Sequence, residues 1–313
     1  MKLQKDVFTL IHCLVAACAG LAAPAVQAQA PDYSKVEFRS EKLADNLFVL
    51  FGAGGNIAVL TGAEGAFVVD SDLTEMSAKL RSALALVSDQ RVRFLVNTHF
   101  HFDHAGGNPT LGRGNAVIVA QENVRKRLSG KQVITLDSLV MNFEPTPREG
   151  LPVITFEDGL RFHVNDEEIA LTHVANAHTD GDAFVYFEKA NVLHTGDLMM
   201  SIGYPVVDVG NGGSLAGLIA AQEKVLKVCN DRTRVIPGHG PLVGKADLQA
   251  YHDMLVAIRQ RVSDLIRKGR SLEQVRAAAP SREFDERWGK GLFSPDAFVQ
   301  RVYIELNRKP GPR

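Results

Sequence analysis

The sequence predicts a mixed α/β fold, and three observations support this class. Short apolar runs rich in Val, Ile, Leu and Phe alternate with stretches of helical periodicity along most of the 313 residues. Histidines and aspartates stand at or just beyond the ends of several apolar runs, where one sheet edge can collect them. The last quarter differs, because its apolar residues recur at the spacing of long amphipathic helices.

The first hundred residues are expected to be mainly strands. Their apolar runs predict opening strands at 38–50, 56–61 and 65–70. A helix over 76–87 then leads to the apolar run 94–96.

Short strands with turns between them are expected through the middle of the chain. They are predicted at 116–120, 153–156, 160–164, 168–174, 183–187, 190–193 and 234–236. A helix is expected over 121–128. The segment 142–152 is punctuated by Pro and Gly, so we expect it to cross between the two halves beside the site.

The C-terminal part predicts helices. The segment 245–268 forms one amphipathic stripe, whose apolar positions are Leu248, Tyr251, Leu255, Ile258, Val262 and Leu265. Ser271 is placed to cap a second helix, and a third is expected over 295–306. The apolar stripe could be buried against the rest of the chain or in a dimer interface. Burial within the chain is the simpler explanation, so we expect these helices to cover the same domain.

Residues 97–108, which read NTHFHFDHAGGN, are the most informative part of the chain. Within six positions they hold His99, His101, Asp103 and His104. Imidazole and carboxylate ligands without thiolate suit zinc and similar ions, and they can leave a coordination position open for water. Alternate side chains of an extended segment point the same way, so His99 and His101 can close on one ion. Asp103 and His104 can turn toward a second, neighbouring ion.

Three further candidate ligands follow strand-like runs later in the chain. They are His178, Asp197 and His239, and each stands where a turn can hold it rigidly. We therefore expect them to converge on the same sheet edge as the histidine cluster.

In this order, the motifs resemble those of the metallo-β-lactamase superfamily of zinc hydrolases, over about residues 47–251. The resemblance implies an α/β fold of the four-layer αββα type, with a dinuclear site at the sheet edges between two similar halves. We expect a catalytic domain at 31–245, preceded by a signal peptide at 1–30. The C-terminal helices of 246–313 are expected to pack on that domain.

The resemblance also implies a role for each ligand. The first of two zinc ions would be bound by His99, His101 and His178. The second would be bound by Asp103, His104 and His239, and Asp197 would bridge the two. Asp70, at the end of an apolar run, would support the ligand loop through hydrogen bonds. His194 lies three residues before Asp197, so it either supports that ligand or is a hydrogen-bonded histidine of the core.

The N-terminus predicts export. Lys2 and Lys5 precede an apolar stretch at 7–26 and small-residue cleavage sites at 26–30, so the mature protein would be periplasmic or secreted, without a membrane span. A lipobox-like segment ending at Cys18 is an alternative, but the apolar run continues beyond it. Cys229 is then the single cysteine of the mature chain, which excludes an internal disulfide and favours a small buried residue.

The charge argues against polyanionic partners. The formal net charge is −1, and the chain has no basic run of the kind that nucleic-acid binding requires. A small-molecule substrate is therefore expected, while the sequence does not fix the oligomeric state.

Two zinc ions would supply a bridging hydroxide near pH 7, with Asp103 orienting it as the catalytic residue. The zinc at His99 would polarise the scissile carbonyl and stabilise its developing oxyanion. Amide or ester hydrolysis is the expected reaction.

The substrate is less sharply predicted. Plasmid-type β-lactamases have a cysteine at the Asp197 position and a lysine three residues later, where this chain has Met200. The bridging aspartate resembles the glyoxalase II and lactonase enzymes, but 198–205 lacks a basic anchor for glutathione. Tyr204 and Asn211 are expected near the substrate.

We therefore expect a hydrolase that opens a cyclic amide or ester, with β-lactam hydrolysis as a weak activity. The alternatives are a lactonase or esterase and, third, a glyoxalase II-like thioesterase. A di-iron oxidoreductase is disfavoured because no flavodoxin-like segment follows. The full ligand set argues against both a mononuclear iron dioxygenase and a metal-stabilised binding protein.

Overall fold

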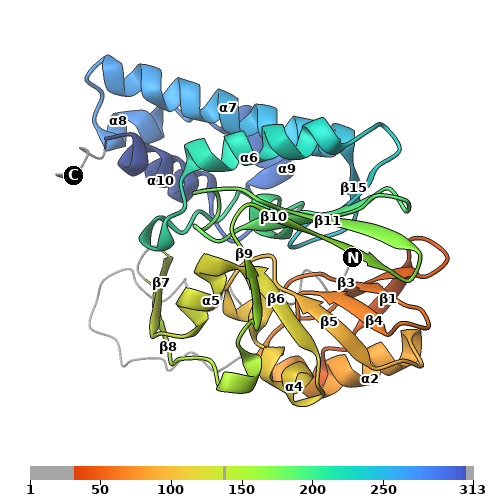
Figure 1. The fold of residues 1–313 in the computed structure, drawn as a ribbon. Helices are drawn as coiled ribbons and strands as arrows, with labels where there is room; N and C mark the ends of the chain where they lie inside the picture. Colours follow the sequence, from red (N-terminus) through yellow and green to blue (C-terminus); the bar gives the residue numbers. More distant parts are fainter. Residues whose placement is uncertain (1–31, 137–138, 308–313) are drawn as a thin grey trace.

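The computed structural model describes residues 32–136 and 139–307. Two β-sheets lie face to face, with helices on both outer faces (Figure 1). Side chains of both sheets share one buried cluster, which includes Phe67 and Val69 of the first sheet and Ile169 and Phe187 of the second. The layers are therefore helix, sheet, sheet and helix, which confirms the predicted fold class.

The first sheet has seven strands in the order β1-β2-β3-β4-β5-β6-β9. Their bounds are β1 Arg39–Lys42, β2 Leu47–Phe51, β3 Ile57–Leu60, β4 Ala66–Val69, β5 Val92–Val96, β6 Val117–Gln121 and β9 Ile154–Phe156. β1 to β4 pair antiparallel, whereas β4, β5, β6 and β9 run parallel. The single strand predicted at 38–50 was wrong: it is two strands, because the chain turns at 43–46 and Leu43 N donates to Leu47 O.

The second sheet has six strands in the order β10-β11-β12-β13-β14-β15. Their bounds are β10 Gly159–Val164, β11 Glu167–His173, β12 Ala183–Phe187, β13 Val192–His194, β14 Arg234–Ile236 and β15 Val243–Gly244. β13 and β14 are parallel, and the other neighbours are antiparallel. The strands predicted for this region agree with these bounds to within two residues.

Helices cover the outer face of each sheet. On the first sheet lie α2 (Ser77–Val87) and α4 (Asn108–Arg113), and on the second lie α6 (Leu215–Val228) and α7 (Lys245–Arg267). The remaining helices are α3 Phe102–Ala105, α5 Glu122–Leu128, α8 Leu272–Ala277, α9 Asp285–Trp288 and α10 Pro295–Asn307. Short 3-10 turns are η1 Tyr33–Lys35, η2 Thr74–Met76, η3 Arg148–Gly150, η4 Gly196–Leu198, η5 Val209–Asn211 and η6 Arg282–Phe284.

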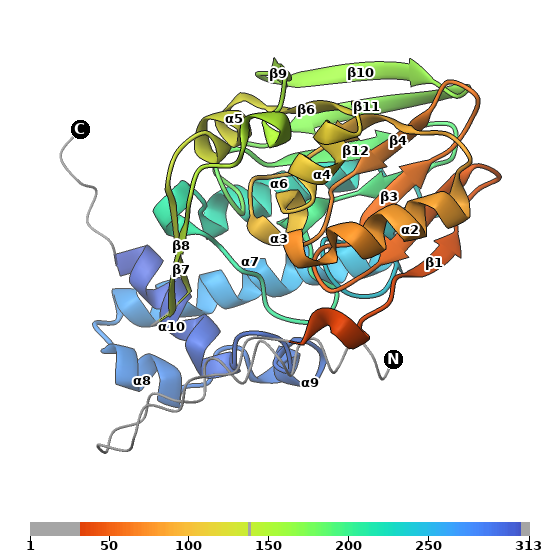
Figure 2. The same ribbon diagram turned by 90° about the horizontal axis from the view of Figure 1, so that it is seen from below.

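A two-stranded hairpin, β7 (Gln132–Leu136) and β8 (Leu139–Phe143), stands beside α5 (Figure 2). Its alternation buries Ile134 in an apolar cluster while Val133 and Val140 stay exposed. The predicted crossing segment 142–152 therefore overlaps the end of β8. The sequence did not predict these two strands, because the Pro and Gly residues after them favoured an irregular segment.

The C-terminal helices pack as the apolar stripe predicts. Leu248, Tyr251 and Leu255 of α7 are fully buried in one cluster with Phe298 of α10 and residues of α6. Ser271 caps α8, because its side chain accepts a hydrogen bond from Gln274 N. The described helices include none that is long and apolar enough to cross a membrane. The predicted signal peptide and Cys18 lie outside the described residues.

Candidate metal centre

The histidine cluster begins just after the C-terminal end of β5, an inner strand of the first sheet. Asp70 directly follows the neighbouring strand β4 and adopts a left-handed conformation with φ 65°. Its carboxylate accepts hydrogen bonds from Thr98 N and Thr98 Oγ1, both at 2.8 Å. These bonds fix the path of the loop from which His99 and His101 project, and α3, which carries Asp103 and His104, follows directly.

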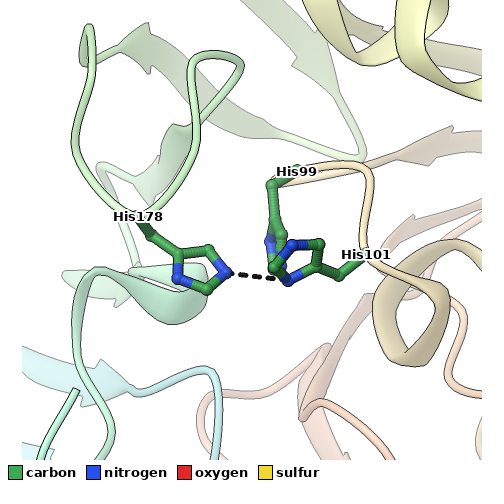
Figure 3. Close-up of side chains that lie close together, drawn as sticks. All are labelled: His99, His101 and His178. Atoms are coloured by element: carbon green, nitrogen blue, oxygen red, sulfur yellow. Dashed lines mark hydrogen bonds between the residues drawn. The ribbon is translucent and has the colours of Figure 1, made fainter. Parts of the chain in front are cut away.

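Three histidines form the first ligand group (Figure 3). His99 and His101 come from the loop after β5, and His178 comes from the loop after β11, so both sheets contribute. Nδ1 of His101 lies 2.9 Å from Nε2 of His178, and all three rings are buried. His99 Nε2 is buried and has no hydrogen-bond partner among the described residues.

Hydrogen bonds on the far side of each ring determine which nitrogen carries the proton. His178 Nδ1 donates to Val206 O at 2.8 Å, because a carbonyl oxygen can only accept. His101 Nε2 faces the Asp208 carboxylate at 3.0 Å, and His99 Nδ1 faces Thr98 Oγ1 at 3.1 Å. In the neutral rings the opposite nitrogens therefore carry no proton, and their lone pairs converge on one point. These nitrogens are His178 Nε2, His101 Nδ1 and His99 Nε2. Such convergence is repulsive unless a cation lies between them.

The second ligand group lies beside the first and contains Asp103, His104 and His239. His239 Nε2 is 3.1 Å from Asp103 Oδ2 and 3.2 Å from His104 Nε2. His104 Nδ1 is held by Asp70 Oδ2 at 2.8 Å, which again leaves Nε2 facing the site. The Asp103 and His239 side chains are 21% and 14% exposed, whereas His104 is not exposed, so the site opens to solvent on the Asp103 side.

Asp197 lies between the two groups. Its Oδ1 is 3.1 Å from His104 Nε2 and 3.4 Å from His239 Nε2, while its Oδ2 is 3.6 Å from His178 Nε2. Two carboxylate oxygens directed at two groups give the arrangement of a bridging ligand. All seven predicted ligands therefore come together in space.

The electrostatics of the two groups differ. Burial lowers the pKa of His99 well below its ordinary value and lowers the pKa of His178 to about 4, so both rings stay neutral. Burial also opposes charge on His239, but Asp197 and Asp103 outweigh it and raise the pKa of His239 to about 9. In the metal-free site His239 is therefore protonated at pH 7, and a metal ion that binds there would replace that proton.

Close backbone approach requires glycine at two positions of the site. A Cβ on Gly55 would lie 2.3 Å from the His104 ring, and a Cβ on Gly238 would lie 2.0 Å from Asp197 Oδ1. Any side chain at either position would displace a ligand.

The predicted supporting residues occupy the expected neighbourhood. Asp70 holds both His104 and the ligand loop, as described above. His194 is completely buried in β13, where its Nε2 donates to Asn56 O and its Nδ1 accepts from Gly196 N. It is therefore a hydrogen-bonded core histidine that also fixes the residue next to Asp197.

The structure corrects the two residues that were expected near the substrate. Tyr204 is 0% exposed, its hydroxyl donates to Asp285 Oδ1 at 2.6 Å, and its ring stacks on Phe298. Asn211 uses its amide within the protein, donating from Nδ2 to Asp208 and Val133 and accepting from Arg127. Both predictions relied on chain proximity to the site, which does not report side-chain direction.

Sequence reasoning missed Asp208. Despite its burial, the hydrogen bond from His101 keeps the pKa of Asp208 below its ordinary value, so it is an ionised partner for this ring. No motif distinguishes Asp208 in the sequence. A carboxylate about 30 residues after a predicted histidine ligand gives no signal without the fold.

This chain is similar to several known proteins. The model of the metallo-beta-lactamase superfamily matches residues 50–250. A probable metallo-hydrolase of Methanocaldococcus jannaschii is 24% identical over 202 residues, which cover 64% of this chain and 89% of the relative.

Two solved structures show the same fold. A metallo-beta-lactamase from Pontibacter korlensis aligns with a TM-score of 0.53 and 18% identity, covering 70% of this chain and 99% of that one. A stereoselective inverting sec-alkylsulfatase from Pseudomonas sp. aligns with a TM-score of 0.66 and 17% identity. That alignment covers 98% of this chain and 57% of the sulfatase.

The sandwich and its histidine and aspartate groups define a metal-dependent hydrolase. The match over 50–250 is more specific, and the chain belongs to the metallo-beta-lactamase superfamily. The residues present fit divalent metal ions, since imidazole nitrogens and carboxylate oxygens of both groups face one another at a buried site.

Proposed function

We propose that the protein is a dizinc hydrolase that opens a cyclic amide or ester of a small molecule. The observation that carries this proposal is the convergence of two ligand groups on the two ends of one buried carboxylate, Asp197. Imidazole and carboxylate ligands suit zinc, and two adjacent groups suit two ions.

The proposed chemistry divides between the ions and the chain. When bound, two zinc ions lower the pKa of a bound water toward neutrality and polarise a carbonyl. His99, His101 and His178 would hold one ion, and Asp103, His104 and His239 would hold the other. Asp103 lies on the solvent side of the site, where its carboxylate can accept a hydrogen bond from the attacking water and orient it.

The substrate class is inferred from Asp197 and the residues that follow it. Leu198, Met199 and Met200 are buried apolar residues, so this segment offers no cation for a glutathione or antibiotic carboxylate. A lactonase or general esterase is therefore the alternative to cyclic-amide hydrolysis, and thioester hydrolysis comes third. We further propose that the protein is exported after cleavage near residue 30, which the intact mass of the purified mature protein would test.

A substrate panel tests the proposal. Zinc-loaded protein is assayed with nitrocefin, a carbapenem, a lactone, a thioester and a secondary alkyl sulfate, beside an Asp103→Ala variant whose metal content is measured. We expect turnover of a lactone or β-lactam that the variant loses by at least about 100-fold. Full activity in the metal-loaded variant would contradict the role of Asp103, and turnover of the sulfate alone would replace the proposed substrate class.

A further inference from the structure

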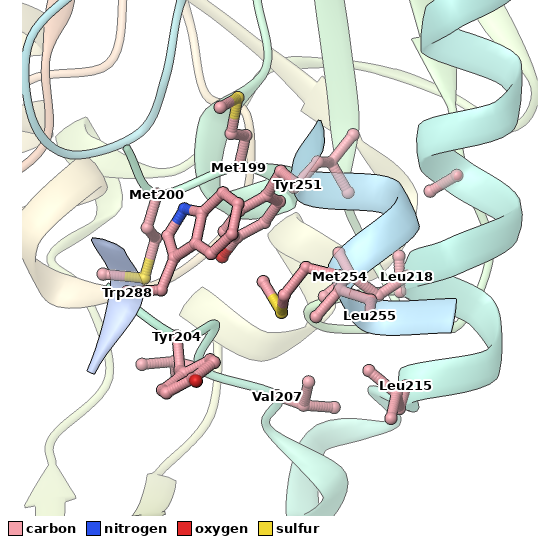
Figure 4. Packing of buried hydrophobic residues seen from close by; sticks show 14 of the residues in the cluster. Met199, Met200, Tyr204, Val207, Leu215, Leu218, Tyr251, Met254, Leu255 and Trp288 are labelled. Atoms are coloured by element: carbon pink, nitrogen blue, oxygen red, sulfur yellow. The ribbon is translucent and has the colours of Figure 1, made fainter. Parts of the chain in front are cut away.

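Residues 203–208, called the strap below, form an irregular segment that is buried throughout (Figure 4). A buried segment without regular structure needs partners for its backbone groups. Tyr204 N donates to Trp288 O at 3.1 Å, and Asp208 N donates to His178 O at 2.9 Å. The strap is thus tied at one end to the C-terminal helices and at the other to a ligand loop.

The inner side of the strap holds two residues of the first ligand group. Val206 O accepts from His178 Nδ1 at 2.8 Å, and Asp208 Oδ2 lies 3.0 Å from His101 Nε2. These bonds fix both the tautomer and the tilt of the two rings. A shift of the strap would therefore move His178 and His101 together.

The outer side of the strap is held mainly through Tyr204. Its ring stacks on Phe298 of α10 at a centroid distance of 4.5 Å and an interplanar angle of 6°, and its hydroxyl donates to Asp285 of α9 at 2.6 Å. Pro205 and Val207, in contrast, border a cavity of about 360 Å³ beside α10. On this outer side, the ring stack and the side-chain hydrogen bond to the C-terminal helices are therefore those of Tyr204.

The second ligand group is anchored elsewhere. His104 is held by Asp70 of the first sheet edge at 2.8 Å. The loop that carries His239 is held by Asn56, whose Nδ2 donates to Pro237 O at 2.8 Å and to Gly240 O at 2.9 Å. Neither anchor involves the strap, and its nearest link to this group is Ser201, two residues before it, whose N donates to His239 O at 3.0 Å.

We propose that Tyr204 is a positioning residue through which the C-terminal helices set the geometry of the first ligand group more strongly than that of the second. Tyr204 contacts neither metal nor substrate: it acts through Val206 on His178 and through Asp208 on His101. The inference rests on the proposed function only in that the first group binds a metal ion. It assigns to α9 and α10 a role in metal affinity rather than in stability alone.

Zinc and cobalt titrations of the metal-free mature protein test this assignment. Tyr204→Phe removes the hydroxyl bond to Asp285 but keeps the ring. The matched control is Tyr303→Phe, which removes a tyrosine hydroxyl of α10 that donates to Arg270 O rather than to α9. Asp208→Asn identifies the first ion, since removing a direct partner of a ligand weakens its ion by about 10 to 100-fold.

For Tyr204→Phe we expect affinity for that same ion to fall by about 10-fold, because the effect passes through the strap. The second ion should lose clearly less affinity than the first, and the visible cobalt spectrum of the first ion should change. Imidazole nitrogen resonances of His101 and His178 should shift in the metal-free variant, with those of His104 unchanged. Tyr303→Phe should match wild type throughout.

Two results would overturn the inference. One is a Tyr204→Phe variant that binds both ions within twofold of wild type and leaves the imidazole signals unmoved. The other is equal loss of affinity for both ions, which would show a general loss of stability. These titrations measure metal binding and not hydrolysis. If the protein hydrolyses no panel substrate but Tyr204→Phe selectively weakens the first ion, the proposed function is refuted and the inference is supported.

Discussion

At the scale of single residues, the metal-facing nitrogens of His99, His101, His104 and His178 are selected by the partner of the opposite ring nitrogen. Asp70 does this for His104, and through Thr98 it also fixes His99. The same carboxylate thus serves one residue of each ligand group. Its effect on metal binding should therefore be broader than that of Tyr204 or Asp208.

An Asp70→Asn variant tests this. Asparagine tolerates the left-handed conformation that Asp70 adopts, so the backbone is conserved. We expect affinity for both ions to fall, and that for the second ion by about 10 to 100-fold, because the amide replaces the carboxylate that holds both His104 and Thr98. The measurement is competitive zinc titration with a chelator, and an affinity equal to that of wild type would show that Asp70 only shapes the loop.

The pH dependence of metal binding follows from His239. In the metal-free site its pKa is raised to about 9, so it carries a proton at neutral pH that a metal ion must displace. The apparent zinc affinity should therefore increase as the pH rises from 6 toward 9. The increase should be about 10-fold per pH unit for each proton displaced. Isothermal titration at several pH values measures this, and a flat profile would contradict the protonated state of His239.

At the scale of elements, the central part of the site could be predicted and its surroundings could not. The cluster from His99 to His104 is local in sequence, so alternation along the chain suffices to indicate converging ligands. Asp208 was missed because its role depends on a contact with His101, 107 residues earlier in the chain. The hairpin β7–β8 is local, but the Pro and Gly residues after it favoured an irregular segment. The segment that contains Tyr204 does lie beside the site, but its ring faces α10 instead of the substrate side, and only packing decides that direction.

Helix α7 illustrates an element that the sequence predicts well, because its apolar period is long and regular. Leu255 is completely buried in the cluster that α7 shares with α6 and α10, whereas Val256, the next residue, is 41% exposed. Leu255→Ala should lower the free energy of unfolding by about 2 to 5 kcal/mol. Val256→Ala, the matched control, should stay within about 0.5 kcal/mol of wild type.

Urea unfolding followed by circular dichroism measures both variants. We expect one transition for the whole chain, because the C-terminal helices share a core cluster with the second sheet. A separate early transition lost in Leu255→Ala would show instead that the C-terminal helices fold as an independent unit.

At the scale of the whole molecule, the ligands join the two halves of the sandwich. His99, His101, Asp103 and His104 come from the first half, while His178, Asp197 and His239 come from the second. Metal binding should therefore stabilise the fold as well as permit hydrolysis. At a free zinc concentration about 1,000 times the dissociation constant, one site adds about 4 kcal/mol.

Metal ions bound at these seven residues should be what makes the protein a hydrolase. The most direct test is the turnover of a responsive panel substrate, measured as zinc is added back stepwise to chelator-treated protein with the bound zinc per chain determined at each step. We predict negligible turnover without metal and maximal turnover at two zinc ions per chain. Undiminished turnover in the metal-free protein, or two bound zinc ions without hydrolysis of any panel substrate, would contradict the claim.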